Sequence, residues 1–143
     1  MRNYDVGTKT QQVGYAYQNS ICPWHAHDPI NGTIEEWEYG GVSYDCLHPT
    51  ECLLIETKHG YADFLEQKDW SPSGRPQLKE WADKAEIKVF DDMIDQAERQ
   101  RDAAISPTSP ARLKWVFSES ITKIYVFERF LDEGLWMIEV ETR

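Results

Sequence analysis

The sequence predicts an α/β fold in which one mixed central sheet is flanked by helices. Two observations carry this prediction. Three strand-like runs follow one helical segment in the first half of the chain, and a long helical segment then separates them from a fourth strand-like run. The order is therefore αβββαβ, with an additional αβ unit at the C-terminal end. At 143 residues the chain is long enough for one domain with its own core, and we assign residues 1–143 to it.

The first third of the chain predicts a helix, a loop and a hairpin. Residues 8–20 are read as the helix, and residues 22–32 as a loop because they contain two prolines and an Asn-Gly pair. Thr33–Tyr39 and Val42–Leu47 read as strands joined by Gly40-Gly41, a pair typical of a tight hairpin turn. Pairing across that turn sets Glu36 opposite Asp45.

The run from Cys52 to Thr57 predicts the central strand, because apolar residues occupy both of its faces. Side chains in a strand repeat every two residues, so Glu56 and Lys58 share one face. If the chain turns at residues 48–51, Asp45 falls almost opposite Glu56, about 4.5 to 5.5 Å away between Cβ atoms. Two carboxyl groups and one ammonium group are thus expected in one small patch.

The second half of the chain predicts a helix, a strand, a helix and a strand. Apolar residues recur at three- and four-residue steps over 77–105, where Gln96 and Gln100 lie one turn apart. A proline-containing stretch at 106–110 ends that helix, and residues 113–117 read as the fourth strand. Residues 118–120 then cap a helix that closes at Gly134, and residues 135–141 form a last strand.

The acidic patch is expected to bind a divalent cation, because two close carboxylates repel each other unless a cation takes up their charge. Carboxylate oxygens without an organised thiolate or imidazole suit Mg²⁺ or Mn²⁺. Such an ion activates a water molecule and neutralises charge on a phosphoryl group. Lys58 would orient or deprotonate that water, since the pKa of a buried lysine falls readily.

The pattern of Asp45 followed by Glu56-Thr57-Lys58 resembles the PD-(D/E)xK nuclease superfamily, which has the restriction endonuclease-like fold. The longer string resembles the restriction-endonuclease-fold toxin 5 domain of polymorphic bacterial toxins and type VI secretion effectors. Its residues are Glu36-Trp37, Gly41–Asp45 and Glu56–Phe64. The chain departs from the pattern at Cys46, where glycine is expected after the aspartate.

The resemblance implies a metal-dependent nuclease that forms the C-terminal part of a larger effector. Asp45, Glu56 and Lys58 would be catalytic, and Asp45, Glu56 and also Glu36 would hold Mg²⁺ or Mn²⁺. Residues expected to face substrate are Gln18, His59, Gln96 and Gln100, each of which would otherwise be an ordinary polar surface residue. DNA is the implied substrate in preference to RNA, although the residues themselves do not distinguish the two.

The same resemblance implies protein partners and a route. A toxin of this kind needs a cognate immunity protein in its producer, and the rest of the effector would bind secretion-machinery or chaperone proteins. The chain would be cytoplasmic before export and then delivered into the target bacterial cell. No apolar run approaches the roughly 18 residues of a membrane span, so no membrane partner is expected.

Charge and cysteine content limit these expectations. The formal net charge of −10 argues against unaided tight DNA binding, which normally requires a basic surface. Bound metal ions add positive charge that this count omits. The three cysteines, an odd number without regular spacing, predict no disulfide framework and favour a reducing compartment.

Three other interpretations stay open. The chain could be a nuclease fold that binds a protein without hydrolysis, which its acidic composition suits. A zinc site could be built from Cys22, His25 and His27 with Cys46 or His48 as a further ligand. A cysteine hydrolase could use Cys46 or Cys52 with His48, but Cys52 begins an apolar strand and is expected to be buried and inert.

Overall fold

The structure is a computed structural model and describes residues 2–5, 9–24, 27–28, 33–48, 50–106 and 111–143. The elements in chain order are β1 (Arg2–Asp5), α1 (Lys9–Ile21), β2 (His27–Asp28), β3 (Thr33–Tyr39), β4 (Val42–Tyr44), β5 (Cys46–His48), β6 (Leu53–Lys58), the short 3₁₀ helix η1 (Ala62–Phe64), β7 (Leu65–Glu66), β8 (Gln77–Leu78), α2 (Glu80–Lys84), α3 (Val89–Ala104), β9 (Arg112–Phe117), α4 (Ser120–Asp132) and β10 (Glu139–Thr142).

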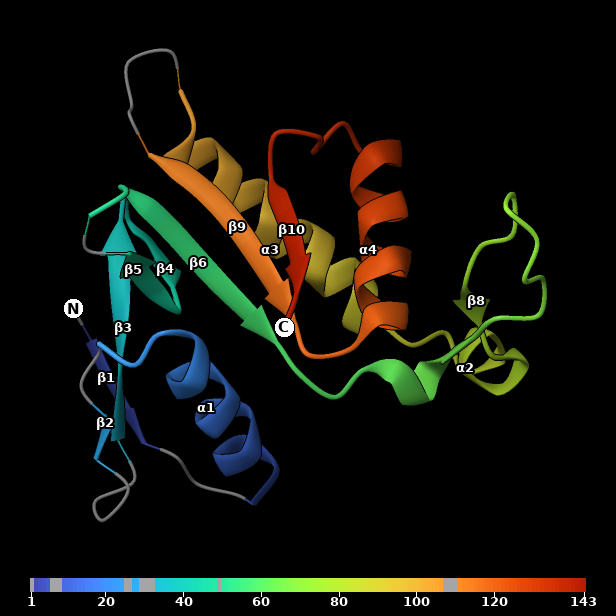
Figure 1. Cartoon of the computed structure of the whole chain (residues 1–143), viewed down its shortest axis with the longest axis horizontal. Helices are drawn as coiled ribbons and strands as arrows, with labels where there is room; N and C mark the ends of the chain where they lie inside the picture. The colour runs from blue at the N-terminus through green and yellow to red at the C-terminus, as the bar shows by residue number, and fades with distance from the viewer. Residues whose placement is uncertain (1, 6–8, 25–26, 29–32, 49, 107–110) are drawn as a thin grey trace.

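The central sheet has the strand order β10-β9-β6-β5 and is mixed. β6 pairs in parallel with β9, and β9 with β10, whereas β5 runs antiparallel to β6. Helices α3 and α4 cover one face of this sheet, and α1 lies against the other (Figure 1). This arrangement confirms the predicted α/β fold with a mixed central sheet between helices.

Alternation along the strands divides the core into two clusters. Leu54 of β6 packs with Trp115 and Phe117 of β9 beneath α3 and α4. Ile55 follows Leu54 in sequence and Val116 follows Trp115, and both of these residues face α1 instead. The four residues at the start of β6 are all buried, as expected for a strand covered on both sides. The smaller cluster beneath α1 also contains two cysteines, Cys22 and Cys46.

The predicted hairpin around Gly40-Gly41 is confirmed. Tyr39 pairs with Val42 and Trp37 with Tyr44, and both glycines have positive φ, +61° and +80°. At Gly40 a side chain would also meet Ala103, whose Cβ lies 3.1 Å from the position of an added Cβ. Glycine is needed in this turn because other residues rarely adopt that backbone conformation.

Three segment predictions are corrected. The single helix expected over 77–105 is the strand β8 followed by two helices, because the chain turns after Lys84 through Glu86, whose φ is +50°. The final strand begins at Glu139 and not at 135, because Ile138 closes a turn onto Leu135. The expected loop at 22–32 contains β2, which pairs with β3, and β1 was not anticipated.

Because α1 and α3 lie on opposite faces of the sheet, side chains of β6 contact one helix or the other according to the face they occupy.

Within the described ranges, no helix is both long and apolar enough to cross a membrane. The end of the 106–110 segment falls on residues 107–110, which lie outside the described residues.

Candidate active site

Asp45 lies at a bend that interrupts the strand predicted over 42–47. Tyr44 is buried on the α3 side of the sheet and Cys46 on the α1 side, although strand alternation would place residues two apart on one face. The Asp45 carboxyl accepts two hydrogen bonds at Oδ2, from the backbone N–H of Thr57 at 2.6 Å and from its hydroxyl at 2.7 Å. The bend therefore turns the carboxyl towards the end of β6.

Glu56 lies beside Asp45 because β5 and β6 pair with Cys46 opposite Ile55. The residue is 4% exposed, and both of its carboxyl oxygens accept hydrogen bonds. Oε1 accepts from Gln100 at 2.9 Å, and Oε2 accepts from Gln96 at 3.1 Å and from the Lys58 ammonium at 3.0 Å. Side chains from α3 thus hold Glu56 in a single position.

Lys58 shares the face of Glu56, as alternation predicts. Its ammonium also donates to Gln96 at 2.7 Å and lies 4.9 Å from the centre of the Trp115 ring. Burial lowers the pKa of Lys58, but the nearby carboxyl groups of Glu56 and Asp45 raise it more, so the net shift is upward. Lys58 therefore stays a cation, and its predicted role in deprotonating water does not fit these surroundings.

The surroundings of Asp45 disfavour its charged form, whereas those of Lys58 favour the charged form of the lysine. Burial raises the pKa of Asp45, the neighbouring Glu56 raises it further, and Lys58 with the Thr57 hydrogen bonds offsets only part of the rise. The net pKa lies well above the usual aspartate range. The charged form of Asp45 is thus disfavoured in the protein alone, and a cation beside it would relieve this cost.

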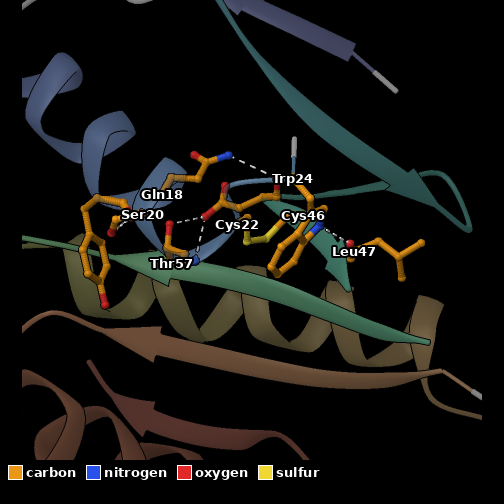
Figure 2. The surroundings of a disulfide bond; sticks show 9 residues. Gln18, Ser20, Cys22, Trp24, Cys46, Leu47 and Thr57 are labelled. Atoms are coloured by element: carbon orange, nitrogen blue, oxygen red, sulfur yellow. Dashed lines mark hydrogen bonds between the residues drawn. A yellow bond between two sulfur atoms is a disulfide. The ribbon is translucent and has the colours of Figure 1, made fainter. Parts of the chain in front are cut away.

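A cavity of about 300 Å³ opens on the same side of the sheet as α1. Its lining residues come from α1, from the β3–β4 hairpin and from the segment 56–61: Gly14, Tyr15, Gln18, Glu36, Asp45, Glu56, Thr57, His59 and Tyr61. Figure 2 shows Gln18 above Thr57 on the strand. Three carboxylates line this cavity. Lys58 is not among the lining residues, but its ammonium donates a hydrogen bond to Glu56, which is one of them.

The donor set fits a magnesium-type ion. Both hydrogen bonds of the Asp45 carboxyl within the described residues reach Oδ2, which leaves Oδ1 for a ligand. Carboxylate oxygens are the ligands that Mg²⁺ and Mn²⁺ prefer, and Mg²⁺ is usually held by one or two of them with water and phosphate. In the described part of the chain, no three His, Cys, Asp or Glu side chains are grouped to hold a metal by themselves.

The residues expected to face substrate divide into two pairs. Gln18 and His59 both line the cavity; Gln18 donates to the backbone oxygen of Asp45 at 3.1 Å. His59 Nδ1 lies 2.8 Å from the Ser118 hydroxyl, and its ring centre lies 5.4 Å from that of Tyr17.

Gln96 and Gln100 point to Glu56 and not to the cavity. Gln100 is fully buried, and besides Glu56 it contacts the Ser43 carbonyl at 3.2 Å and the Trp115 indole N–H at 2.9 Å. The expectation that Gln100 contacts substrate is therefore wrong, because no face of it reaches solvent. It positions Glu56 instead.

Two contributors to the site were not anticipated. Thr57 anchors Asp45 through its backbone and hydroxyl, and Trp115 lies against the Lys58 ammonium. The signal for Thr57 was available, since a polar residue between Glu56 and Lys58 must face the opposite side of β6. No signal marked Trp115, because its partners lie far away in sequence.

Cys22 and Cys46 form a disulfide, with their Cα atoms 6.4 Å apart. The prediction that the cysteines make no disulfide is therefore wrong, because the fold brings the end of α1 against β5. The zinc interpretation loses Cys22 and Cys46 as ligands, and His25 lies outside the described residues. The cysteine hydrolase interpretation loses Cys46 as a nucleophile. Cys52 was expected to be buried, but it is exposed.

Comparison with known families agrees with this geometry. A family model described as restriction endonuclease fold toxin 5 matches residues 14–120, which include the bend at Asp45, all of β6 and α3. The fold and the site define a restriction endonuclease-like domain of the toxin class. The chain belongs to the restriction endonuclease fold toxin 5 family. No curated protein matches the chain.

Proposed function

We propose that this protein is a metal-dependent nuclease, the toxin domain of a secreted bacterial effector. The single observation that supports this most directly is that Asp45 and Glu56 line one cavity, while the Lys58 ammonium forms an ion pair with Glu56. Membership of a restriction endonuclease fold toxin family suggests nuclease activity. The metal, the reaction and the roles of the residues are our proposal.

In this mechanism Asp45 and Glu56 would hold one or two Mg²⁺ or Mn²⁺ ions, and Glu36 of β3, which lines the same cavity, is a further candidate carboxylate. A divalent cation at this position would supply Lewis acidity and lower the pKa of a bound water below that of bulk water. Lys58, kept positively charged by its neighbours, fixes Glu56 and adds positive charge close to the phosphodiester. Most of the rate enhancement then comes from positioning and charge stabilisation.

Gln18 and His59 are the proposed substrate contacts, because both line the cavity. His59 contacts Ser118 and Tyr17, and we propose that its imidazole contacts a phosphate oxygen. We propose DNA as the substrate. The net charge of −10 means that cations at the site, and other parts of a longer effector, must assist in binding a polyanion.

The proposal extends to partners and location. A nuclease toxin requires an immunity protein in the producing cell, and we propose that this partner covers or distorts the cavity. Secretion-machinery or chaperone proteins, including those of type VI secretion, would bind the remainder of the effector. The chain would pass from the producer's cytoplasm into the target cell.

Plasmid nicking tests the proposal. Native protein should cut in Mg²⁺ or Mn²⁺ and stop in excess chelator, and Asp45→Ala and Lys58→Ala should lose cleavage. Asp95→Ala is the matched control, because Asp95 is exposed on α3, away from the cavity. Cleavage that ignores the metal or persists in both site variants would sink the proposal and indicate a contaminant.

The alternative is a nuclease fold that binds a protein without hydrolysis. One observation favours it: Glu56 and Lys58 are already paired to each other and to Gln96. Under this alternative, no divalent cation changes the thermal stability of the native protein, and no nucleic acid is cut. The same nicking assay therefore separates the two functions.

A further inference from the structure

The disulfide lies directly beside the proposed metal-binding carboxylate. Cys46 is the residue after Asp45, and Cys22 is the residue after the last one of α1. The two cysteines are 0% and 1% exposed, so the bond is enclosed by protein. Figure 2 shows it between α1 and β6, close to Gln18 and Thr57.

The disulfide lies within a short series of contacts that join the end of α1 to the bend at Asp45 and to β5. Gln18 donates to the backbone oxygen of Asp45 at 3.1 Å, and the N–H of Cys22 donates to the carbonyl of Gln18 at 2.9 Å. Beyond Cys22, the Trp24 indole donates to the Leu47 carbonyl at 2.8 Å. Hydrogen bonds therefore reach the residues on both sides of Cys46, Asp45 and Leu47, and the covalent bond lies between them.

Tyr17 also anchors this end of α1, through the bond of its hydroxyl to the Arg143 carbonyl and its packing on the apolar cluster. Of the α1 residues whose side chains the structure describes, only Gln18 and Ile21 are buried. The apolar cluster beneath the helix is small, and two of its six buried members are the bonded cysteines. Without the bond, α1 would depend on a few contacts to keep one wall of the cavity, formed by Gly14, Tyr15 and Gln18, in place.

Asp45 occupies the bend between β4 and β5, and its half-buried carboxyl lies at the cavity beside Glu56. Thr57 holds this carboxyl at Oδ2, but the direction of the carboxyl also depends on the backbone of the bend. The covalent bond at the next residue restricts that backbone, because it ties Cys46 to Cys22 at the end of α1.

We propose that the Cys22–Cys46 disulfide is the positioning element of the carboxylate site, so that high metal affinity and cleavage belong to the oxidised chain. This inference rests on the proposed metal-dependent nuclease function. It adds that the site is completed by passage through an oxidising compartment. Arrival in a reducing cytoplasm then leaves the enclosed bond intact for as long as the site stays closed.

The Cys22–Cys46 bond forms by thiol–disulfide exchange. The two thiols lose two protons and two electrons, and a disulfide-bearing oxidant is reduced to its dithiol. A thiolate of one cysteine attacks the oxidant to form a mixed disulfide, and the second thiolate displaces it. Reduction runs the same steps backwards and requires a thiolate to reach a sulfur that is enclosed in the native fold.

The experiment compares oxidised native protein, native protein reduced with a phosphine, and the double variant Cys22→Ala/Cys46→Ala. The matched control is Cys52→Ala, which removes the exposed third cysteine outside the bond. Mn²⁺ affinity is measured by titration calorimetry, cleavage as kcat and KM on an oligonucleotide, and folding by circular dichroism. Mass spectrometry after alkylation reports the state of each cysteine.

We expect the reduced protein and the double variant to stay folded, to bind Mn²⁺ at least about tenfold more weakly, and to lose kcat more than KM changes. Reoxidation should restore the native protein but not the double variant, and Cys52→Ala should match the native protein. Equal Mn²⁺ affinity and kcat in folded, reduced protein would overturn the proposal. So would unfolding of both reduced forms, which would make the bond a stabiliser of the whole fold.

The two proposals fail differently. If the oxidised native protein binds no Mn²⁺ and cuts nothing, the nuclease function itself fails. If it binds and cuts, and reduction changes neither property, only the positioning role of the disulfide fails.

Discussion

The Gln100 side chain donates a hydrogen bond of 2.9 Å to the Glu56 carboxyl across 44 residues of sequence. This amide is fully buried, and it also joins the Ser43 carbonyl and the Trp115 indole. A residue of α3 thereby links the β3–β4 hairpin, the central strand and β9. Gln100 thus fixes one oxygen of the Glu56 carboxyl, while Gln96 and Lys58 bond the other.

Gln100→Leu is expected to destabilise the protein by about 3 to 5 kcal/mol, because several buried groups lose a partner and each such loss costs about 1 to 3 kcal/mol. Urea denaturation followed by tryptophan fluorescence measures the change. Gln77→Leu makes the same substitution at an exposed position of β8 and should change stability by no more than about 0.5 kcal/mol. Equal effects in the two variants would show that the Gln100 network contributes little.

Lys58→Met should lower cleavage by at least about 100-fold, because it removes a charge that acts on the transition state. Since the pKa of Lys58 is raised, the residue acts as a cation and not as a base. Lys58→Arg keeps the charge and should therefore retain at least about tenfold more activity than Lys58→Met. Single-turnover cleavage rates provide the measurement, with circular dichroism to confirm folding.

Equal inactivity of folded Lys58→Arg and Lys58→Met would contradict this assignment, because a general base cannot be replaced by arginine. The buried pair with Glu56 also predicts a stability effect. Removing one partner of such a pair costs about 3 to 5 kcal/mol, so Lys58→Met should unfold at a lower urea concentration than the native protein.

Asp45→Asn should make the metal-free protein more stable at neutral pH. The pKa of Asp45 is raised by burial and by Glu56, so the folded state holds a proton that the unfolded chain has released. Its unfavourable contribution is absent below the ordinary aspartate pKa of about 3.9 and grows as pH rises towards the folded pKa. The melting temperature of the variant minus that of the native protein should therefore increase between pH 4 and pH 8.

Bound metal should make the native protein melt at a higher temperature than Asp45→Asn, the reverse of the metal-free order. Saturating Mn²⁺ stabilises a protein by about 2.7 kcal/mol at 100 times its dissociation constant, and only native protein should benefit. Asp95→Asn, on the exposed side of α3, controls for the loss of one carboxylate and should follow the native protein at every pH. A difference in melting temperature that stays flat with pH would contradict the electrostatic account of Asp45.

Glu119→Ala should loosen the turn that carries Tyr61 into the cavity. The Glu119 carboxyl accepts the backbone N–H groups of Tyr61 at 2.8 Å and Ala62 at 3.0 Å, and the Thr122 hydroxyl at 3.2 Å. Losing bonds to a charged acceptor should cost about 2 to 3 kcal/mol, measured by thermal unfolding. Amide exchange at residues 61 and 62 should rise with it.

Glu133→Ala is the control for that change, because Glu133 is exposed at the end of α4 and should alter stability by about 0.5 kcal/mol or less. Unchanged exchange at residues 61 and 62 in Glu119→Ala would mean that the turn is held by other contacts. The packing of Tyr61 near Phe90, with ring centres 6.5 Å apart, would then be the main restraint.

Much of the fold followed from local patterns. The Gly40-Gly41 turn and the register that places Glu36, Asp45 and Glu56 around one cavity were predicted from alternation and turn chemistry. Helix α1 at Lys9–Ile21 and strand β9 at Arg112–Phe117 lie within two residues of their predicted bounds. These features depend on contacts between neighbours in sequence or across a tight turn, so a single sequence contains them.

The amino-acid sequence by itself determined the three acids, the lysine on the face of Glu56, and the family. Only the tertiary structure decided that the pKa of Lys58 is raised, that Gln100 is buried against Glu56, and that Cys22 bonds to Cys46. The physical reason is that burial and long-range contact set these properties. Desolvation, a pKa and a disulfide partner depend on which distant segments pack together, and strand or helix periodicity does not carry that information.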